Sequence, residues 1–379
     1  MSGAVPVTFV SSHAHLGGEE GYLATLLEEL GPDWIQEVVL LDEGPFVECL
    51  RAQGYPLHVL PTSRRAGIAV SAWRLRRHFA RTRPQLVHAN GVKAALVAAL
   101  AGRAPLLWLK HDFSWDGKLA RFIGRRSRLV VGVSGAVTET FEGSGVEAKV
   151  VHTGIRNIHA DREAGRRRLL EALGTPEPTA VAAIAARVDP TKGHDEVLAV
   201  LPEILERVPG FRLAIMGAEH APHLEHAAGL RREVVEQGLG QAVTFLGYRN
   251  DAVELISGCD AVLIPSTVDE RGLGREGFPL TALEAMAVGT PVIGYDHGGL
   301  PELVGNCGVL VPPGDRASLR DAILEVVGEE GLRSRLARCG PERVATRFAL
   351  PRFVDEMKER YREAANRAAM PEGSDVGRG

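Results

Sequence analysis

The stretch AVLIPSTVDERGLGREGFPLTALEAMAVGTPVIGYD, residues 261–296, holds an apolar run, a polar loop and two further apolar runs. The runs 261–266 and 291–296 are apolar up to their last residues, Ser266 and Asp296, as strands buried on both faces of a parallel sheet are. Pro279 suits the first position of a helix, so the apolar run that follows it predicts a helix between the two strands. This order predicts one βαβ unit of a doubly wound sheet.

The same alternation of short apolar runs and helical patterns extends along the whole chain. It predicts strands at 5–12, 37–42, 57–60, 85–90, 106–111, 129–134 and 149–154, and then at 179–187, 212–218, 243–248, 261–266, 291–296 and 309–313. The polar stretch from Asn157 to Pro178 breaks the pattern. We therefore predict an α/β protein of two doubly wound, Rossmann-like domains that face each other across a cleft.

The predicted parts are an N-terminal domain, a C-terminal domain, a helix that packs back toward the N-terminal domain, and a disordered tail. Their bounds are 1–165, 175–347, 348–367 and 368–379. The tail is too polar and glycine-rich to order. A length of 379 residues with 45% apolar residues suits two soluble domains.

Targeting signals and cysteine motifs are not evident. The chain shows no charged-then-apolar leader and no membrane-spanning apolar run, so we expect a cytoplasmic protein. Its scattered cysteines form no CxxC pair, which predicts neither a zinc site nor a disulfide framework. They are Cys49, Cys259, Cys307 and Cys339.

Positive charge is concentrated in residues 61–128, which hold fifteen Lys or Arg against Asp112 and Asp116. Seven of the arginines fall within 64–83. Two interpretations stay open: solvated helix faces, or a surface for an acidic acceptor or for the inner face of an anionic membrane. No aromatic stacking pattern accompanies the arginines, so nucleic acid is disfavoured.

Ligands of doubly wound sheets bind at the carboxyl ends of strands, so the loops after strands are the candidate sites. Gly17 and Gly18 precede a helix, where bare backbone can approach an anion or serve packing. His13 and His15 flank them with no acid at metal-ligand spacing, so we expect no metal site. His111 ends a strand, where it could hydrogen-bond a substrate hydroxyl or be a buried structural residue.

The second half carries two charged loops after strands. Arg187 and Lys192 stand on a Pro-Gly turn after strand 179–187 and suit a diphosphate, although cations on turns are often only solvated. Glu276 lies in the loop before Pro279, and Glu284 lies in the second turn of the helix. The backbone N–H groups between these glutamates could bind an anion, with sugar hydroxyls on one side and ribose hydroxyls on the other.

A glycine pattern in the same loop offers a different interpretation. GLGREG, residues 272–277, matches GxGxxG, and Asp296 ends a strand about twenty residues later, as in a dinucleotide site. The third glycine precedes the helix start at Pro279, so it cannot pack within the helix. Dinucleotide binding is therefore disfavoured.

Taken together, these segments resemble the retaining glycosyltransferases of family 4. REGFPLTALEAMAVGTPVI resembles the family's E-x7-E segment, and ARVDPTKGHD resembles its GR-x-D-x-x-KG segment. FLGYRND, GGLPELV and LGGEEGYL resemble three further family segments. The match is dense over about 180–315 and sparse before it.

The resemblance implies a GT-B fold, a UDP- or GDP-linked sugar donor, transfer with retention, and no metal or other cofactor. Arg187 and Lys192 would neutralise the diphosphate, Glu284 would bind the ribose, and Glu276 and His111 would contact the donor sugar. The predicted catalytic residues are Arg187, Lys192, Glu276 and His111. Further donor-binding residues are Gly17, Gly18, Tyr248, Gly277, Phe278, Leu280 and Thr281, with the backbone near Tyr248 and Arg249 meeting the base.

One departure and three alternatives accompany this prediction. Thr153-Gly154-Ile155 stands where the family often has Pro-Asn-Gly-Val, so contacts there are open. The alternatives are a nucleotide-sugar epimerase, an NAD-dependent dehydrogenase and a non-catalytic sugar-nucleotide sensor. The acceptor is not identified by the sequence, although the basic region admits an anionic or lipid-linked one.

Overall fold

The computed structural model describes residues 3–14, 17–61, 67–176, 178–219, 221–269, 272 and 274–369. Its contacts divide the chain into two compact units, each described here by itself. The first unit comprises the residues up to Gly154 together with those from Leu350 onward, and the second comprises Ile155–Ala349. The predicted tail from residue 370, His15, Arg64 and Arg65 lie outside the described residues.

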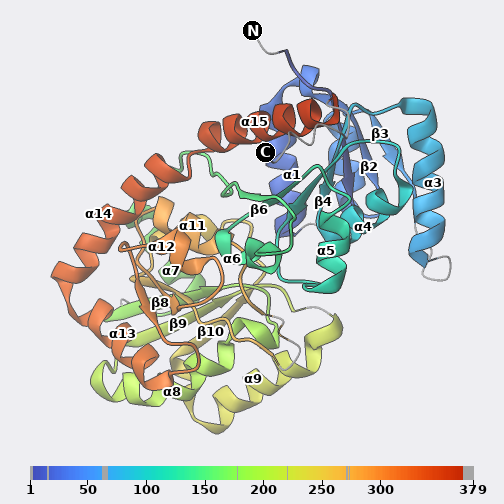
Figure 1. Cartoon of the computed structure of the whole chain (residues 1–379). Helices are drawn as coiled ribbons and strands as arrows, with labels where there is room; N and C mark the ends of the chain where they lie inside the picture. Colours follow the sequence, from blue (N-terminus) through green and yellow to red (C-terminus); the bar gives the residue numbers. More distant parts are fainter. Residues whose placement is uncertain are drawn as a thin grey trace. The chain divides into compact units, whose positions relative to one another are not determined.

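The first unit contains a parallel sheet of seven strands in the order β3-β2-β1-β4-β5-β6-β7 (Figure 1). The strands are β1 (Val7–Ser11), β2 (Ile35–Leu40), β3 (Leu57–Val59), β4 (Leu86–Asn90), β5 (Leu106–Lys110), β6 (Leu129–Gly132) and β7 (Ala148–Val150). The helices are α1 (Gly18–Leu30), α2 (Pro45–Ala52), α3 (Gly67–Thr82), α4 (Val92–Ala101), α5 (Lys118–Gly124), α6 (Gly135–Thr138) and α15 (Leu350–Ala369), with short 3₁₀ turns at Pro32–Trp34 and Glu139–Phe141.

The second unit contains a parallel sheet of six strands in the order β10-β9-β8-β11-β12-β13. The strands are β8 (Ala180–Ala185), β9 (Phe211–Met216), β10 (Val243–Gly247), β11 (Ala261–Ile264), β12 (Val292–Tyr295) and β13 (Val309–Val311). The helices are α7 (Arg162–Leu173), α8 (His194–Arg207), α9 (Leu224–Glu236), α10 (Ala252–Ser257), α11 (Leu280–Ala287), α12 (Leu300–Val304), α13 (Arg316–Gly328) and α14 (Glu330–Arg347), with 3₁₀ turns at Pro190–Lys192, Ala221–His223 and Leu239–Gln241.

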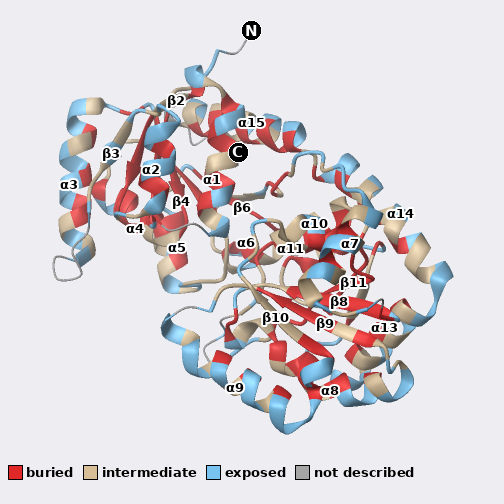
Figure 2. Ribbon diagram, turned by 180° about the vertical axis from the view of Figure 1, so that it is seen from behind, coloured by how far each residue is buried: buried red, intermediate tan, exposed pale blue. Residues whose placement is uncertain are grey.

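These sheets confirm the predicted α/β fold class of two doubly wound units. In each unit the central strands are buried while the helices expose their outer faces (Figure 2). The chain order reverses between β1 and β4 in the first sheet and between β8 and β11 in the second. Such reversal points leave room for a ligand outside the carboxyl ends of the strands. The loops after β1, β4, β8 and β11 are therefore the first places to look for a site.

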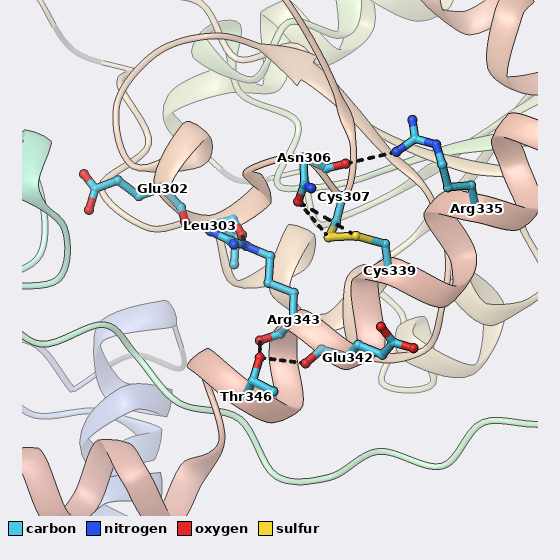
Figure 3. Close-up of a disulfide and its surroundings, with 9 residues drawn as sticks. All are labelled: Glu302, Leu303, Asn306, Cys307, Arg335, Cys339, Glu342, Arg343 and Thr346. Atoms are coloured by element: carbon cyan, nitrogen blue, oxygen red, sulfur yellow. Dashed lines mark hydrogen bonds between the residues drawn. A yellow bond between two sulfur atoms is a disulfide. The ribbon is translucent and has the colours of Figure 1, made fainter.

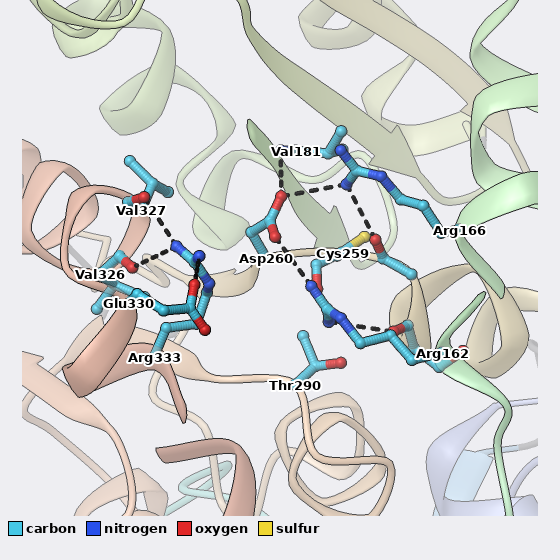
Figure 4. Close-up of polar contacts among 12 residues, drawn as sticks. Arg162, Arg166, Val181, Cys259, Asp260, Thr290, Val326, Val327, Glu330 and Arg333 are labelled. Atoms are coloured by element: carbon cyan, nitrogen blue, oxygen red, sulfur yellow. Dashed lines mark hydrogen bonds and ion pairs between the residues drawn. The ribbon is translucent and has the colours of Figure 1, made fainter. Parts of the chain in front are cut away.

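The polar stretch 157–178, predicted as a domain boundary, contains α7, which is anchored to the second sheet by charge. Arg162 Nη2 lies 2.9 Å from Asp260 Oδ1, and Arg166 Nη1 lies 3.1 Å from Asp260 Oδ2 (Figure 4). The Val181 N–H donates to the same carboxylate at 2.8 Å. Asp260 therefore joins α7 to the starts of two central strands.

Two cysteines that were expected to be unpaired form a disulfide. Cys307 and Cys339 are bonded, with their Cα atoms 5.2 Å apart (Figure 3). The prediction of scattered, unpaired cysteines was wrong at these two positions. Arg343 of α14 donates to the Leu303 carbonyl at 2.7 Å, which holds α14 against the turn after α12 and brings residues 32 apart in sequence into contact. Cys49 and Cys259 are free.

The last described helix, α15, belongs to the first unit. Its Tyr361 is fully buried, and its hydroxyl lies 2.8 Å from Nδ1 of His88 in β4. The edge of the Tyr361 ring also faces Phe9 of β1. Among the described residues, no helix is long and apolar enough to cross a bilayer.

Candidate functional site

The second unit brings its predicted charged residues together at the carboxyl edge of its sheet. Lys192 lies in the 3₁₀ turn after β8, and Glu276 lies in the loop between β11 and α11. Lys192 Nζ is 2.7 Å from Glu276 Oε1, although the two residues are 84 positions apart. The hydroxyl of Ser266, just after β11, donates to the same carboxylate oxygen at 2.7 Å. Glu276 is thus held by a cation and a hydroxyl from two different loops.

A glycine makes this approach of the two loops possible. Gly193, directly after Lys192, has φ +69°, and a Cβ there would lie 1.8 Å from the carbonyl oxygen of Pro265. The Thr267 N–H donates to the carbonyl of Thr191 at 2.9 Å, which joins the same two loops through their backbones. A larger residue at 193 would separate Lys192 from the loop that carries Ser266.

The turn that holds Lys192 is shaped by Asp189. Its carboxylate accepts hydrogen bonds from the backbone N–H and the hydroxyl of Thr191, at 2.9 and 2.7 Å. Burial would raise the pKa of Asp189, but these two hydrogen bonds, with His223 and Arg187, outweigh it and lower the pKa. Arg187 itself is exposed at the end of the loop. The turn therefore presents two cations on a structure held by an ionised carboxylate.

The helix α11 begins one residue later than predicted, at Leu280, with Pro279 as its N-cap. The hydroxyl of Thr281 donates to the Ala185 carbonyl at 2.9 Å, which fixes the first turn of the helix to the end of β8. Gly277, Phe278 and Pro279 are buried in the loop ahead of it. The helix start is therefore held beside the reversal point between β8 and β11.

Glu284 lies in the second turn of α11 between buried apolar residues. Burial raises the pKa of its carboxyl to about 7. Within the described part of the chain, no hydrogen bond or ion pair is formed by this carboxyl. An unpaired, desolvated carboxyl is often found at a ligand site, and the ribose role of Glu284 stays a prediction.

Two polar residues at this edge were not singled out from the sequence. Ser266 contacts Glu276, and Nε2 of His297, directly after β12, donates to the Ser266 carbonyl at 2.6 Å. The Gly299 N–H donates to the Glu276 carbonyl at 2.8 Å. Ser266 ends the predicted strand 261–266, and His297 directly follows the predicted strand 291–296, so their positions at strand ends were the signal that could have identified them.

The residues predicted to meet the base are less enclosed. Tyr248 follows β10, the edge strand of the sheet, and is 76% exposed. Arg249 is engaged by Asp251, with Nε–Oδ1 and Nη2–Oδ2 distances of 2.8 and 2.6 Å. Side chains at this point therefore leave the backbone after β10 open to a ligand.

In the first unit, His111 follows β5 and contacts Asn90 at the end of β4. Its Nε2 lies 2.7 Å from Asn90 Oδ1, and the edge of the Tyr22 ring packs against it. Burial lowers the pKa of His111 to about 4, so the ring is neutral at pH 7. Because Asn90 Oδ1 is an acceptor, Nε2 carries the proton and Nδ1 remains an acceptor.

The expectation that no acid stands near His13 was wrong. His13, Glu19 and Glu20 place one ligand atom each within 4.8 Å of the others, which makes them a candidate metal group among the described residues. The sequence spacing hid this, because α1 begins at Gly18 and its first turn folds back toward the end of β1. Gly17 is the N-cap of that helix.

Part of the basic segment lines a pocket in the described structure. Arg103, Arg125, Arg126 and Arg128 line a pocket at the start of β5 and β6. This is the opposite end of those strands from His111. Part of the positive charge of residues 61–128 therefore lies away from the carboxyl edge of the first sheet.

Family models match both halves of the chain. The model for glycosyl transferases group 1 matches residues 165–343, and the model for Glycosyltransferase Family 4 matches residues 16–156. A D-inositol 3-phosphate glycosyltransferase of Saccharomonospora viridis is 34% identical over 211 residues, which is 54% of this chain and 47% of that protein. Its counterpart in Mycobacterium bovis is 33% identical over 220 residues, 57% of this chain and 43% of that protein. The chain thus spans about half the length of these curated relatives.

Solved structures share the fold over nearly the whole chain. Anabaena HepE in complex with UDP has a TM-score of 0.82 at 23% identity, covering 94% of this chain and 99% of its own. Sucrose-phosphate synthase of Thermosynechococcus elongatus has a TM-score of 0.74 at 20% identity, covering 97% of this chain and 100% of its own. At identities of 23% and 20%, this similarity shows a shared fold and nothing further about function.

Proposed function

We propose that this chain is a glycosyltransferase that transfers a sugar from a nucleoside-diphosphate sugar to an acceptor hydroxyl. The proposal is supported by the Glycosyltransferase Family 4 model in the first half of the chain and the glycosyl transferases group 1 model in the second. The observation that carries the proposal is the contact of Lys192 with Glu276 at the carboxyl edge of the second sheet. A site for a nucleotide-sugar needs a cation that binds the diphosphate and, next to it, a carboxylate that accepts hydrogen bonds from the sugar hydroxyls.

The leaving group is the nucleoside diphosphate, on which negative charge develops as the bond to the sugar breaks. In the proposal, Lys192 and Arg187 stabilise this charge, assisted by the backbone N–H groups at the start of α11. With two cations already present, the diphosphate needs no metal. Glu276, held by Ser266, accepts hydrogen bonds from hydroxyls of the donor sugar.

The nucleoside is proposed to bind between α11 and the loop after β10. Glu284 accepts hydrogen bonds from the ribose hydroxyls, and the backbone at Tyr248 meets the base. The structure of HepE with UDP-glucose makes a uridine diphosphate sugar the first donor to test, and a guanosine diphosphate sugar the second. The roles of His111, Gly17 and Gly18 toward the donor stay predictions.

Transfer is proposed to proceed with retention on the front face of the sugar. The acceptor oxygen bonds to the anomeric carbon as the bond from that carbon to the β-phosphate oxygen breaks. The acceptor proton passes to that phosphate oxygen, so no protein base is required. Charge stabilisation by the cations then supplies the larger part of the rate enhancement.

The acceptor is proposed to be anionic. The net positive charge of residues 61–128 supports this, and the names of the relatives include a phosphate-bearing acceptor. We place the reaction in the cytoplasm, with the basic segment available for peripheral contact at the inner face of the membrane. Binding to vesicles with and without anionic lipid would test that contact.

The proposal is tested by incubating the chain with a panel of UDP- and GDP-sugars and candidate acceptors, with and without EDTA. Proton NMR of the product would give the anomeric configuration. We expect a glycoside with the donor's configuration at an unchanged rate in EDTA. Donor binding with no transfer to any acceptor would favour a sensor, and an inverted product would refute the proposed mechanism.

A further inference from the structure

Three side chains converge at the end of β1 in the first unit, next to Gly17 and Gly18 and apart from the charged residues of the second unit that are assigned to the donor. His13 follows the strand, and Glu19 and Glu20 lie in the first turn of α1. Their ligand atoms all lie within 4.8 Å of one another, yet no hydrogen bond or ion pair joins them. Ligands about 2.1 Å from a shared ion lie roughly 3 to 4.3 Å apart, so this spacing is close to that of a metal site.

Two glycines and an asparagine set the positions of the glutamates. Asn90 Nδ2 donates to the Glu19 carbonyl at 3.2 Å, which fixes the first turn of α1. A Cβ at Gly91, where φ is +83°, would lie 2.9 Å from Glu19 Oε2, and one at Gly17 would lie 2.9 Å from Glu20 Oε2. The Glu19 carboxylate therefore lies beside Gly91 and the Glu20 carboxylate beside Gly17, each in space that a side chain at that one glycine would enter.

The carboxylates have no partner to offset their burial. Glu20 is only 5% exposed, and the described part of the chain offers neither Glu19 nor Glu20 a side-chain hydrogen bond or an ion pair. A buried carboxylate without a partner is costly, and two close together repel each other. The positive end of α1 favours one negative charge there but does not account for the imidazole beside them. A cation would satisfy all three groups.

We propose that His13, Glu19 and Glu20 bind one divalent cation of the Mn²⁺ or Zn²⁺ class. One imidazole nitrogen and two carboxylate oxygens are ligands that such ions accept. Three protein ligands leave further positions for water or for an anionic oxygen of a bound molecule. The site is independent of the diphosphate-binding cations proposed for the second unit.

Mn²⁺ is the sharper probe, because the free thiols of Cys49 and Cys259 prefer softer ions. The full chain, stripped with EDTA and exchanged into metal-free buffer, is titrated with Mn²⁺ while the EPR signal of free Mn²⁺ is recorded. We expect one bound ion per chain. Glu20→Gln and His13→Ala should each weaken binding about 10-fold or more, since even partners beyond the ligands cost that much.

Two control variants separate this site from other effects. Glu225→Gln changes an exposed first-turn glutamate of α9 and should bind Mn²⁺ as the unaltered chain does. Lys192→Ala, which disables the proposed donor site, should also leave Mn²⁺ binding unchanged. Thermal melts check folding, and His13, being exposed, can be replaced even if Glu20→Gln unfolds. Failure of the unaltered chain to bind Mn²⁺ in the millimolar range, or equal binding by His13→Ala, would overturn the proposal.

Discussion

Glu276 is held by one cation and one hydroxyl, and this pairing has a consequence for the role of Lys192. In the proposed reaction, the Lys192 ammonium would turn from the carboxylate to the phosphate oxygens of the donor while Ser266 retains Glu276. The ion pair then serves as a resting arrangement that keeps both side chains in place. The two contacts on one oxygen are therefore consistent with separate roles for Lys192 and Glu276.

Lys192→Ala should reduce kcat about 100-fold or more, because it removes a charge aimed at the leaving group. The fold should survive, since the lysine is at the surface of the turn. Steady-state kinetics and a thermal melt would measure both effects. Arg167→Ala, which removes an exposed cation from α7 in the same unit, is the matched control and should retain full activity. Full activity in Lys192→Ala would contradict its role.

Glu284→Gln should change how stability depends on pH. The folded carboxyl has a pKa raised from 4.5 to about 7, so the folded state holds the proton longer than the unfolded chain. The free energy of unfolding therefore falls as the pH rises from about 4.5 to about 7, by up to on the order of 3 kcal/mol. The variant lacks this loss, so its Tm should rise relative to the unaltered chain between pH 5 and pH 8.

The same variant separates stability from binding. Glu284→Gln should bind UDP more weakly while being more stable at pH 8, because the charge that costs stability is the one proposed to accept the ribose hydroxyls. Glu325→Gln, at an exposed position of α13, should change neither property. Unchanged UDP affinity in Glu284→Gln would exclude the ribose role.

At the residue scale, the sequence could identify charged groups that stand alone in apolar surroundings or follow a buried strand. Lys192 and Glu284 were found in this way. Ser266 and His297 were not, because a serine and a histidine at strand ends are common and their contact with the Glu276 loop depends on tertiary structure. The group of His13, Glu19 and Glu20 was missed for the same reason.

At the scale of elements, the loops after β8 and β11 meet because Gly193 has no side chain. Gly193→Ala should therefore destabilise the second unit and weaken UDP binding, since a Cβ would meet the Pro265 carbonyl. Gly238→Ala is the matched control: its φ is +68°, close to the +69° of Gly193, and its Cβ would meet nothing within 4 Å. Both variants incur a backbone cost of about 1–2 kcal/mol.

The difference between the two variants then measures the steric clash alone. Thermal melts and UDP titration of both would show whether Gly193→Ala loses more than its control. Equal decreases in Tm with UDP binding retained would mean that the loops adjust, and that Gly193 is needed only for its backbone conformation.

Strands were the elements that the sequence predicted best. Every predicted strand overlaps one in the described structure, from 5–12, observed as Val7–Ser11, to 309–313, observed as Val309–Val311. Buried parallel strands are uniformly apolar, so they can be recognised in the sequence. Their ends differ little from the adjoining loops, so most strands were predicted too long. The disulfide of Cys307 and Cys339 could not be predicted, because it depends on where α14 packs.

At the scale of the whole molecule, the chain does not fold as two successive halves. It builds the first sheet, then the second unit, and then returns to the first unit with α15. Hydrophobic periodicity predicted the helix, but periodicity alone does not say which core receives its apolar face. Contacts of Tyr361 with His88 and Phe9 identify that core as the first.

Because α15 packs in the first unit, we expect a core mutation in this helix to destabilise the first unit and not the second. Met357 is fully buried, so Met357→Ala should cost about 2–5 kcal/mol, whereas Asp355→Ala on the exposed face of α15 should cost almost nothing. Hydrogen exchange read by mass spectrometry should show faster exchange in peptides of β1, β4 and α1, although these lie more than 250 residues away in sequence. Peptides of β8 to β13, which are nearer along the chain, should exchange as before. Faster exchange confined to the second unit would show that α15 stabilises that core instead.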